Sequence, residues 1–156
     1  MLNITQFREL IVKPALRDLV LDSVGAEELL VFTCANESLG GTYLAQVKGP
    51  ALGIYQMEPE TYNDIWQNYI NNHSRLAMIM ATNFGCSRMP VEDRLIWDLR
   101  FATAMARIHY ARAMSPLPVP GDVEGIWEYY KTHYNTSKGA AEKVQAIANY
   151  RAFNTN

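Results

Sequence analysis

The spacing of apolar residues along the chain predicts a mainly helical protein. In several segments apolar residues recur at intervals of three and four, which places them on one face of a helix. The pattern is clearest after residue 60, where the stripe consists of Tyr62, Ile65, Trp66, Tyr69 and Ile70. The same periodicity predicts further helices over residues 4–12, 26–36, 74–82, 90–113, 123–133 and 140–151.

Capping and proline signals refine several of these boundaries. Thr5 is a candidate N-cap of the first helix, and Pro14 either kinks that helix or begins a new one at its first turn. Thr61 and Asp64 form a capping box at the start of the helix near residue 60. Pro90 suits the first turn of the longest helix.

Two segments are predicted not to be helical. Residues 115–122, SPLPVPGD, contain three prolines and a glycine and form a rigid connector. Residues 42–57 have strand character on both sides of Gly49-Pro50 and are expected to form a small β region. The predicted fold is therefore a single, mainly α domain over residues 1–156, with a small β excursion directly after Glu37.

Length and composition are those of an ordinary globular domain. The chain has 156 residues, of which 49% are hydrophobic and 19% charged, so it can bury one sizeable core. Its formal net charge is −2 at pH 7. Because there is no basic run and no interleaving of aromatic with basic residues, the chain lacks the electrostatic signature of nucleic-acid binding.

No motif for a metal, a cofactor or a membrane span stands out. His73, His109 and His133 are far apart and form no zinc-binding pattern, and no phosphate or dinucleotide loop occurs. Cys34 is expected to be a small buried residue, while one disulfide with Cys86 stays open. The N-terminus lacks the pattern of a signal peptide, and no apolar run approaches the roughly 20 residues that span a bilayer.

Glu37 is the residue with the clearest chemical potential. It comes just after the apolar run LLVFTC, residues 29–34, and just before a Gly-Gly pair. Apolar surroundings penalise the ionised form of a carboxyl group and raise its pKa. A carboxyl that keeps its proton near neutral pH can donate it to the leaving oxygen of a glycosidic bond. The ordinary alternative is a polar residue at a solvated helix end.

The segment that follows resembles the second motif of soluble lytic transglycosylases and goose-type lysozymes. That motif has a small residue, a glycine, two apolar or aromatic residues and a glutamine, followed by Pro-x-Thr. Residues 51–56 and 59–61 match it. Glu37-Ser38 matches the Glu-Ser of the family's first motif, and Tyr134-Asn135 with Gly139 matches its Tyr-Asn pair followed by glycine.

The resemblance covers residues 29–62 and parts of the last third of the chain. The first 25 residues and the connector at 115–122 lie outside it, and the residues before Tyr134 are not rich in alanine as the family pattern requires. In a chain without a signal peptide, the sequence is similar to lysozyme-like proteins of tailed phages. The fold that the resemblance implies is a lysozyme-like α domain.

The resemblance also implies a role for each matched residue. Glu37 is the expected catalytic acid and base. The expected substrate-binding residues are Ser38, Gly53, Tyr55, Gln56, Tyr134, Asn135 and a closing tyrosine, Tyr150, with Tyr110 competing for that role. From the residues alone, Gly53 permits close backbone approach, Gln56 can bond an N-acetyl group or Glu37, and Tyr55 can stack on a sugar. Each also has an ordinary alternative as a turn, strand or core residue.

The reaction implied is cleavage of the MurNAc–GlcNAc bond of peptidoglycan, without metal or cofactor. Because residues 42–57 contain no carboxylate, Glu37 is expected to act alone and to close a 1,6-anhydro ring on the product. If Glu58 or Asp64 folds back to activate a water, the same site is a hydrolase.

Two functions besides peptidoglycan cleavage stay open at this point. A virion structural or ejection protein can retain a lysozyme-like fold with little or no activity, and a related glycosidase can act on chitin. For the peptidoglycan enzyme, the implied partners are glycan strands and other virion proteins, with no nucleic acid and no membrane span. Its implied location is the virion, or the host cytoplasm before release, with action in the periplasm or cell wall.

Overall fold

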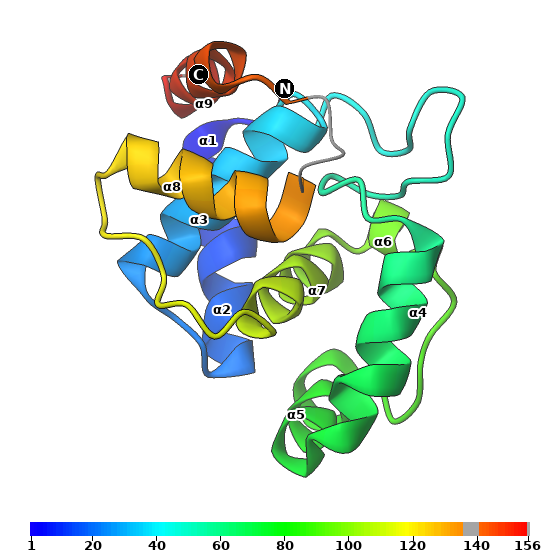
Figure 1. Ribbon diagram of the computed structural model, residues 1–156. Helices are drawn as coiled ribbons and strands as arrows, with labels where there is room; N and C mark the ends of the chain where they lie inside the picture. The colour runs from blue at the N-terminus through cyan, green and yellow to red at the C-terminus, as the bar shows by residue number, and fades with distance from the viewer. Residues whose placement is uncertain (136–140, 156) are drawn as a thin grey trace.

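The computed structural model describes residues 1–135 and 141–155, and this part of the chain is mostly helical with almost no strand structure. Figure 1 shows α3 in the middle of the molecule, with α8 and α9 on one side and α4 and α5 on the other. The helical class predicted from the periodicity is confirmed. The order of the elements along the chain determines which side chains reach the site.

The first helical run is continuous through Pro14. It consists of α1 (Ile4–Phe7), a π-helical turn η1 (Arg8–Val12) and α2 (Lys13–Leu19). A proline inside a helix lacks an N–H and clashes with the carbonyl four residues before it. The π turn widens the helix just before Pro14, since Lys13 N–H bonds the Arg8 carbonyl. The N-cap is Asn3, whose Oδ1 accepts from Gln6 N–H at 3.0 Å, so the prediction of Thr5 was wrong.

The central helix is α3 (Val24–Glu37), as the apolar run predicts. Ser23 caps it by accepting a hydrogen bond from the Ala26 N–H at 3.1 Å. Nine of its residues are buried, including the whole stretch from Leu29 to Ala35. The helix packs against α2, α7, α8 and α9. It ends at Glu37. A helix buried on most faces holds its last residue firmly in place.

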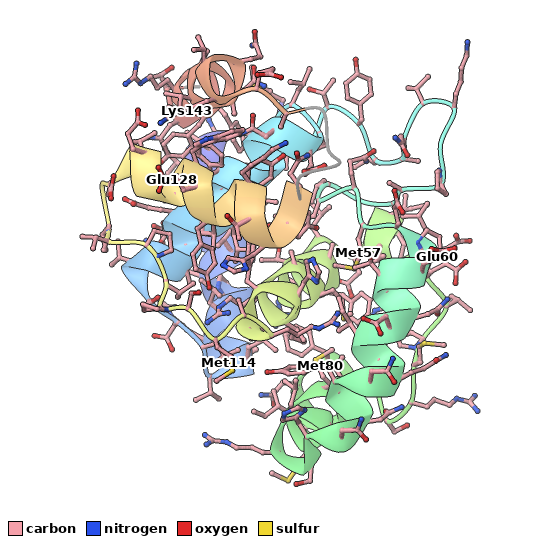
Figure 2. The ribbon with its side chains drawn as sticks, in the orientation of Figure 1. Met57, Glu60, Met80, Met114, Glu128 and Lys143 are labelled. Carbon is pink, nitrogen blue, oxygen red and sulfur yellow. The ribbon has the colours of Figure 1, made fainter. Side chains whose placement is uncertain are left out.

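The next helices begin at proline and serine. α4 (Pro59–Asn68) leads through a short 3₁₀ turn, η2 (Ile70–Asn72), into α5 (Ser74–Phe84). The expected capping box is absent: α4 starts at Pro59, and Asp64 instead accepts hydrogen bonds from Asn68 and Arg112. In Figure 2, Glu60 points outward from the first turn of α4, and it is exposed.

The single long helix predicted after Pro90 is in fact two helices. α6 (Arg94–Trp97) and α7 (Leu99–Ala111) are separated at Asp98, whose backbone is extended. The Asp98 carboxylate accepts from the Phe101 N–H at 2.9 Å and pairs with Arg94 at 2.9 Å. An aspartate that bonds the backbone in this way favours a new N-cap over helix continuation. Periodicity alone missed the break because buried apolar residues occur on both sides of it, Leu95 in α6 and Phe101 in α7.

The last third of the chain follows the prediction closely. Residues 115–122 form a non-helical connector. It begins just after Met114, which follows the end of α7 (Figure 2). α8 (Val123–Tyr130) continues directly into a π-helical turn, η3 (Lys131–Asn135). The final helix, α9 (Lys143–Asn154), begins at residue 143, and residue 140, where the prediction placed its start, lies outside the described residues.

Residues 42–57 form an irregular loop, and the small β region predicted there is reduced to isolated bridges. The segment contains two isolated bridges, Ala45 with Leu52 and Leu52 with Met57, and no strand. Positive φ angles at Lys48, Gly53 and Gln56 interrupt the extended conformation that a ladder needs. Figure 1 shows this loop extending to one side of the helices and returning to α4.

We expect Gly53→Ala to destabilise the protein by about 2–4 kcal/mol. An added Cβ would lie 2.3 Å from the Leu95 carbonyl oxygen, and the φ of +73° is strained for alanine. The matched control is Gly85→Ala, where φ is +66° and no atom lies within 4 Å, so only the backbone cost of roughly 1 kcal/mol applies. Urea denaturation measures both, and equal losses would contradict the close contact between Gly53 and α6.

Candidate functional site

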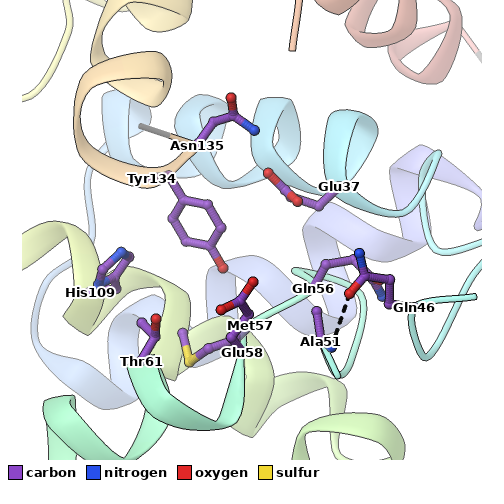
Figure 3. Close-up of a pocket in the computed structure, with 10 residues that line it drawn as sticks. All are labelled: Glu37, Gln46, Ala51, Gln56, Met57, Glu58, Thr61, His109, Tyr134 and Asn135. Carbon is purple, nitrogen blue, oxygen red and sulfur yellow. Dashed lines mark hydrogen bonds between the residues drawn. The ribbon is translucent and has the colours of Figure 1, made fainter. Parts of the chain in front are cut away.

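A pocket of about 370 Å³ opens where the end of α3 faces the irregular loop, the start of α4, the middle of α7 and the π turn η3. Figure 3 shows the side chains that line it converging from these separate segments. Most of them carry polar groups. The lining residues are Glu37, Gln46, Ala51, Gln56, Met57, Glu58, Thr61, His109, Tyr134 and Asn135.

Glu37 lies at one end of this pocket as the last residue of α3. Burial raises the pKa of its carboxyl group from 4.5 to about 7, while hydrogen bonds from Tyr130 and Asn135 act in the opposite direction. Desolvation wins because a carboxylate loses more hydration than two donors restore. The raised pKa expected from the apolar run is confirmed. A carboxyl of this kind holds its proton near neutral pH and can still give it up.

Tyr130, which sequence reasoning missed, contacts this carboxyl directly. Its hydroxyl donates to Glu37 Oε1 at 2.7 Å. The ring is held by Phe32 of α3, with centroids 5.5 Å apart. Burial raises the pKa of Tyr130, so its hydroxyl stays protonated and remains a donor. The signal available in the sequence was its position four residues before Tyr134, which puts both rings near one helix face.

The two tyrosines expected to approach Glu37 lie elsewhere. Tyr150 is buried on α9 against Phe32, with ring centroids 5.3 Å apart. The Tyr110 hydroxyl bonds the hydroxyl of Thr33 at 2.7 Å. Neither lines the pocket. The tyrosine whose hydroxyl bonds Glu37 is Tyr130, and not Tyr150 or Tyr110 as the sequence suggested.

Tyr134 and Asn135 reach the pocket as a pair, as the third motif predicts for their position. The Tyr134 hydroxyl donates to the Tyr55 carbonyl at 2.8 Å, which ties η3 to the irregular loop. Figure 3 shows the Tyr134 ring standing in the pocket and the amide nitrogen of Asn135 pointing toward Glu37. Gly139, the last residue of that motif, lies outside the described residues.

Gln56 shares the pocket with Glu37 (Figure 3). Its backbone has a positive φ of 47°, which is uncommon for a residue with a side chain. The amide nitrogen donates to the Gly53 carbonyl at 2.8 Å, and this fixes the direction of the side chain. A strained, tethered glutamine beside a protonated carboxyl is typical of residues held for a purpose other than packing.

Three of the motif residues, Ser38, Gly53 and Tyr55, hold the loop and lie outside the pocket lining. The Ser38 hydroxyl donates to the Ile54 carbonyl at 2.7 Å and accepts from the Gly41 N–H at 2.9 Å. Gly53 lies directly against the backbone of Leu95, so its lack of a side chain allows the loop to pack closely against α6. Tyr55 is 1% exposed, and its hydroxyl bonds that of Thr103 at 3.2 Å. These side chains shape the site without facing into it.

Two further polar residues line the pocket across from Glu37. Glu58 is exposed at the N-cap position of α4. The sequence had suggested that it belongs to the start of this helix. His109 packs its ring against Tyr134, with centroids 5.1 Å apart. Burial is the main cause that lowers the pKa of His109 to about 4, so its imidazole is neutral at pH 7. Sequence reasoning considered His109 only as a metal ligand, because nothing in the sequence places α7 beside η3.

Both cysteines are buried and free, so the open disulfide between them does not form. Burial raises the pKa of the Cys34 thiol to about 12, which makes it an unreactive core residue as expected. Among the described residues, no group of three or more His, Cys, Asp or Glu side chains could hold a metal ion. None of the described helices has the length and apolar character to cross a bilayer.

Comparisons of the chain with protein-family models, with curated proteins and with solved structures found no match. A partly exposed carboxyl that is half protonated near pH 7 faces an open polar pocket. Such a group can donate a proton to a bound molecule and accept one back, which is the requirement for general acid–base catalysis.

We expect Glu37→Gln to gain stability over the parent protein as pH rises. A carboxyl whose pKa is raised on folding stabilises the fold below its unfolded pKa of 4.5, and this contribution is lost as pH rises through about 7. Between about pH 5 and about pH 8.5 the loss is about 2–3 kcal/mol. Glutamine does not titrate, so the variant avoids it.

Urea denaturation at about pH 5 and about pH 8.5 measures this effect as the change in the stability difference between variant and parent. Glu142→Gln, at an exposed position outside the pocket, controls for the general effect of removing one negative charge. A stability difference for Glu37→Gln that is the same at both pH values would contradict the burial of the carboxyl.

Proposed function

We propose that the protein is a peptidoglycan lytic transglycosylase that cleaves the MurNAc–GlcNAc bond, with Glu37 as its general acid and base. The observation that carries the proposal is the pKa of Glu37, about 7, at the end of a pocket that also contains Gln56, Tyr134 and Asn135. These are the residues that the sequence motifs single out, brought together from three separate segments. The similarity to lysozyme-like proteins of tailed phages supports a role in local opening of the bacterial cell wall.

In the first step, protonated Glu37 donates its proton to the oxygen that bridges the two sugars. The bond between that oxygen and the anomeric carbon of MurNAc breaks, and GlcNAc leaves as an alcohol. The N-acetyl oxygen of MurNAc bonds the anomeric carbon and carries the positive charge into its own ring, so a second carboxylate is not needed. Tyr130 stabilises the carboxylate that forms, because its hydroxyl already donates to Glu37 Oε1.

In the second step, the Glu37 carboxylate takes the proton from the C6 hydroxyl of MurNAc. The C6 oxygen then attacks the anomeric carbon and releases the N-acetyl oxygen, which closes a 1,6-anhydro ring. Glu37 ends the cycle protonated, ready for the next bond. A pKa near 7 suits both steps, since the group must be a usable acid and a usable base at the same pH.

The pocket suits part of a glycan strand in size and polarity. About 370 Å³ is within the usual range for sites that bind small molecules or sugar units. Amide groups of Gln46, Gln56 and Asn135 can both give and accept hydrogen bonds, as sugar hydroxyl and acetamido groups require. Tyr134, and not Tyr55 as the sequence suggested, is the tyrosine that lines this pocket.

Hydrolysis at the same site is a second candidate function, and the position of Glu58 favours it. Glu58 is exposed and lines the pocket that contains Glu37. A second carboxylate on the far side of the scissile bond can activate a water, as in inverting glycosidases. The protein would then be a lysozyme with Glu37 still its acid. Asp64, the other carboxylate considered from the sequence, pairs with Arg112 and does not line the pocket.

We expect Glu37→Gln to fold and to lose murein cleavage by roughly a hundred- to ten-thousand-fold, because glutamine cannot donate an acidic proton. Gln56→Ala should reduce turnover less, since the proton donor remains. Release of dye from labelled murein measures both rates, with Gln145→Ala on the exposed face of α9 as control for an exposed glutamine. Undiminished cleavage by Glu37→Gln would move the acid elsewhere.

Mass analysis of the released fragments separates the candidate functions. The transglycosylase should release fragments that end in 1,6-anhydro-MurNAc, and Glu58→Gln should not change them. Reducing ends that disappear in Glu58→Gln would establish the hydrolase. A folded parent protein that releases no fragments would leave the virion structural role, and cleavage of chitin alone would point to the chitin-directed glycosidase.

A further inference from the structure

A row of three side chains leads along the end of α8 and η3 to the catalytic carboxyl. Trp127, Lys131 and Asn135 are each four residues apart. The Lys131 ammonium lies 6.0 Å from the centre of the Trp127 ring and donates to Asn135 Oδ1 at 2.8 Å. Trp127 is 8% exposed, so the lysine rests on a firmly packed ring.

The bond from Lys131 determines which end of the Asn135 amide faces Glu37. A carboxamide has an acceptor oxygen and a donor nitrogen at opposite ends. Because an ammonium can only donate, it selects the oxygen and leaves the nitrogen for the other side. Figure 3 shows the nitrogen of Asn135 toward the Glu37 carboxyl and the oxygen away from it. The reversed amide would place two acceptors face to face.

The π turn η3 explains why two donors from one helix converge on Glu37. Tyr130 and Asn135 are five residues apart, which in an α-helix would put them on different faces. Hydrogen bonding from residue i to i+5 widens the turn over Lys131–Asn135 and brings these positions to one side. The Tyr130 hydroxyl then bonds the carboxyl, and the amide nitrogen of Asn135 points toward the same group and lowers its pKa.

We propose that Lys131 is a positioning residue that locks the Asn135 amide with its nitrogen toward Glu37. The proposal rests on the proposed function for its catalytic meaning, because positioning matters only if Glu37 acts on a substrate. The lock itself is a property of the free protein. It is measurable without any substrate.

Most of the other titratable groups around Glu37 are uncharged at pH 7. The orientation of the Asn135 amide therefore has a clear effect on the pKa of Glu37. Tyr130 of α8 and Tyr134 of η3 lie beside Glu37, and Tyr110 of α7 lies behind them with its hydroxyl bonded to Thr33. Burial raises the pKa of each of these tyrosines well above 10, so all three are neutral. The pocket adds His109, whose lowered pKa keeps it neutral, and the carboxylate of Glu58. No arginine or lysine is among the described residues that line the pocket.

The test is the pKa of Glu37 in Lys131→Met, measured from the ¹³C shift of its carboxyl carbon and assigned with Glu37→Gln. We expect the pKa to rise by about one pH unit, because the carboxylate loses the hydrogen bond that favours its charged form. The control Lys143→Met removes the same charge at the start of α9, outside the pocket (Figure 2), and should leave the pKa at the parent value. Lys131→Ala suits a helix and replaces the methionine variant if that variant does not fold.

A double-mutant cycle separates positioning from a direct effect of the lysine charge. Asn135→Ala alone should raise the pKa of Glu37, and adding Lys131→Met to it should raise the value no further. Additive rises would overturn the proposal, since the lysine would then act through its charge. An unchanged pKa in both lysine variants would overturn it as well.

Murein cleavage distinguishes failure of this inference from failure of the proposed function. In an active enzyme the alkaline limb of the pH profile should move upward with the pKa of Glu37 in Lys131→Met, because the general acid keeps its proton to higher pH. A pKa that moves in a parent protein that cleaves nothing would support the lock and reject the function. If the parent protein cleaves murein, but Lys131→Met changes neither the pKa of Glu37 nor the alkaline limb of the pH profile, the function is supported and the lock is rejected.

Discussion

The hydrogen bond from Tyr130 to Glu37 is the contact on which the site depends. It joins the last residue of α3 to the last residue of α8 at 2.7 Å, in a place where burial has already made the carboxylate costly. Without a hydrogen-bond donor, the pKa of a buried carboxyl would rise further. With several charged donors, its pKa would fall and the group would lose its proton at neutral pH. One tyrosine and one asparagine leave the pKa of Glu37 near 7, between these extremes.

The helices and the irregular loop are built around that contact. α3 is buried along most of its length, and Ser38 directly after Glu37 holds the loop to the helix end through the Ile54 carbonyl. Tyr134 holds the same loop from the other side by donating to the Tyr55 carbonyl. The loop has little regular structure of its own, so these side-chain bonds, and the fit of Gly53 against Leu95, take the place of a β ladder.

The sequence predicted what depends on local pattern and missed what depends on contacts between distant segments. The apolar run predicted both the central helix and the raised pKa of Glu37, because burial was visible in the run itself. The break at Asp98 was missed since a capping aspartate looks like any polar residue inside an amphipathic stripe. Tyr130 was missed because its partner is 93 residues away. The strand character of residues 42–57 misled, since alternation cannot reveal the positive φ angles of Lys48 and Gln56.

The central claim is that Glu37 is the proton donor in murein cleavage, and its most direct test compares two titrations in one buffer. The first is the carboxyl of Glu37 followed by NMR, and the second is the rate of murein cleavage across the same pH range. We expect cleavage to fall as pH rises, with a midpoint that coincides with the pKa of Glu37, about 7. A rate that climbs steadily through that pKa into alkaline pH would contradict it.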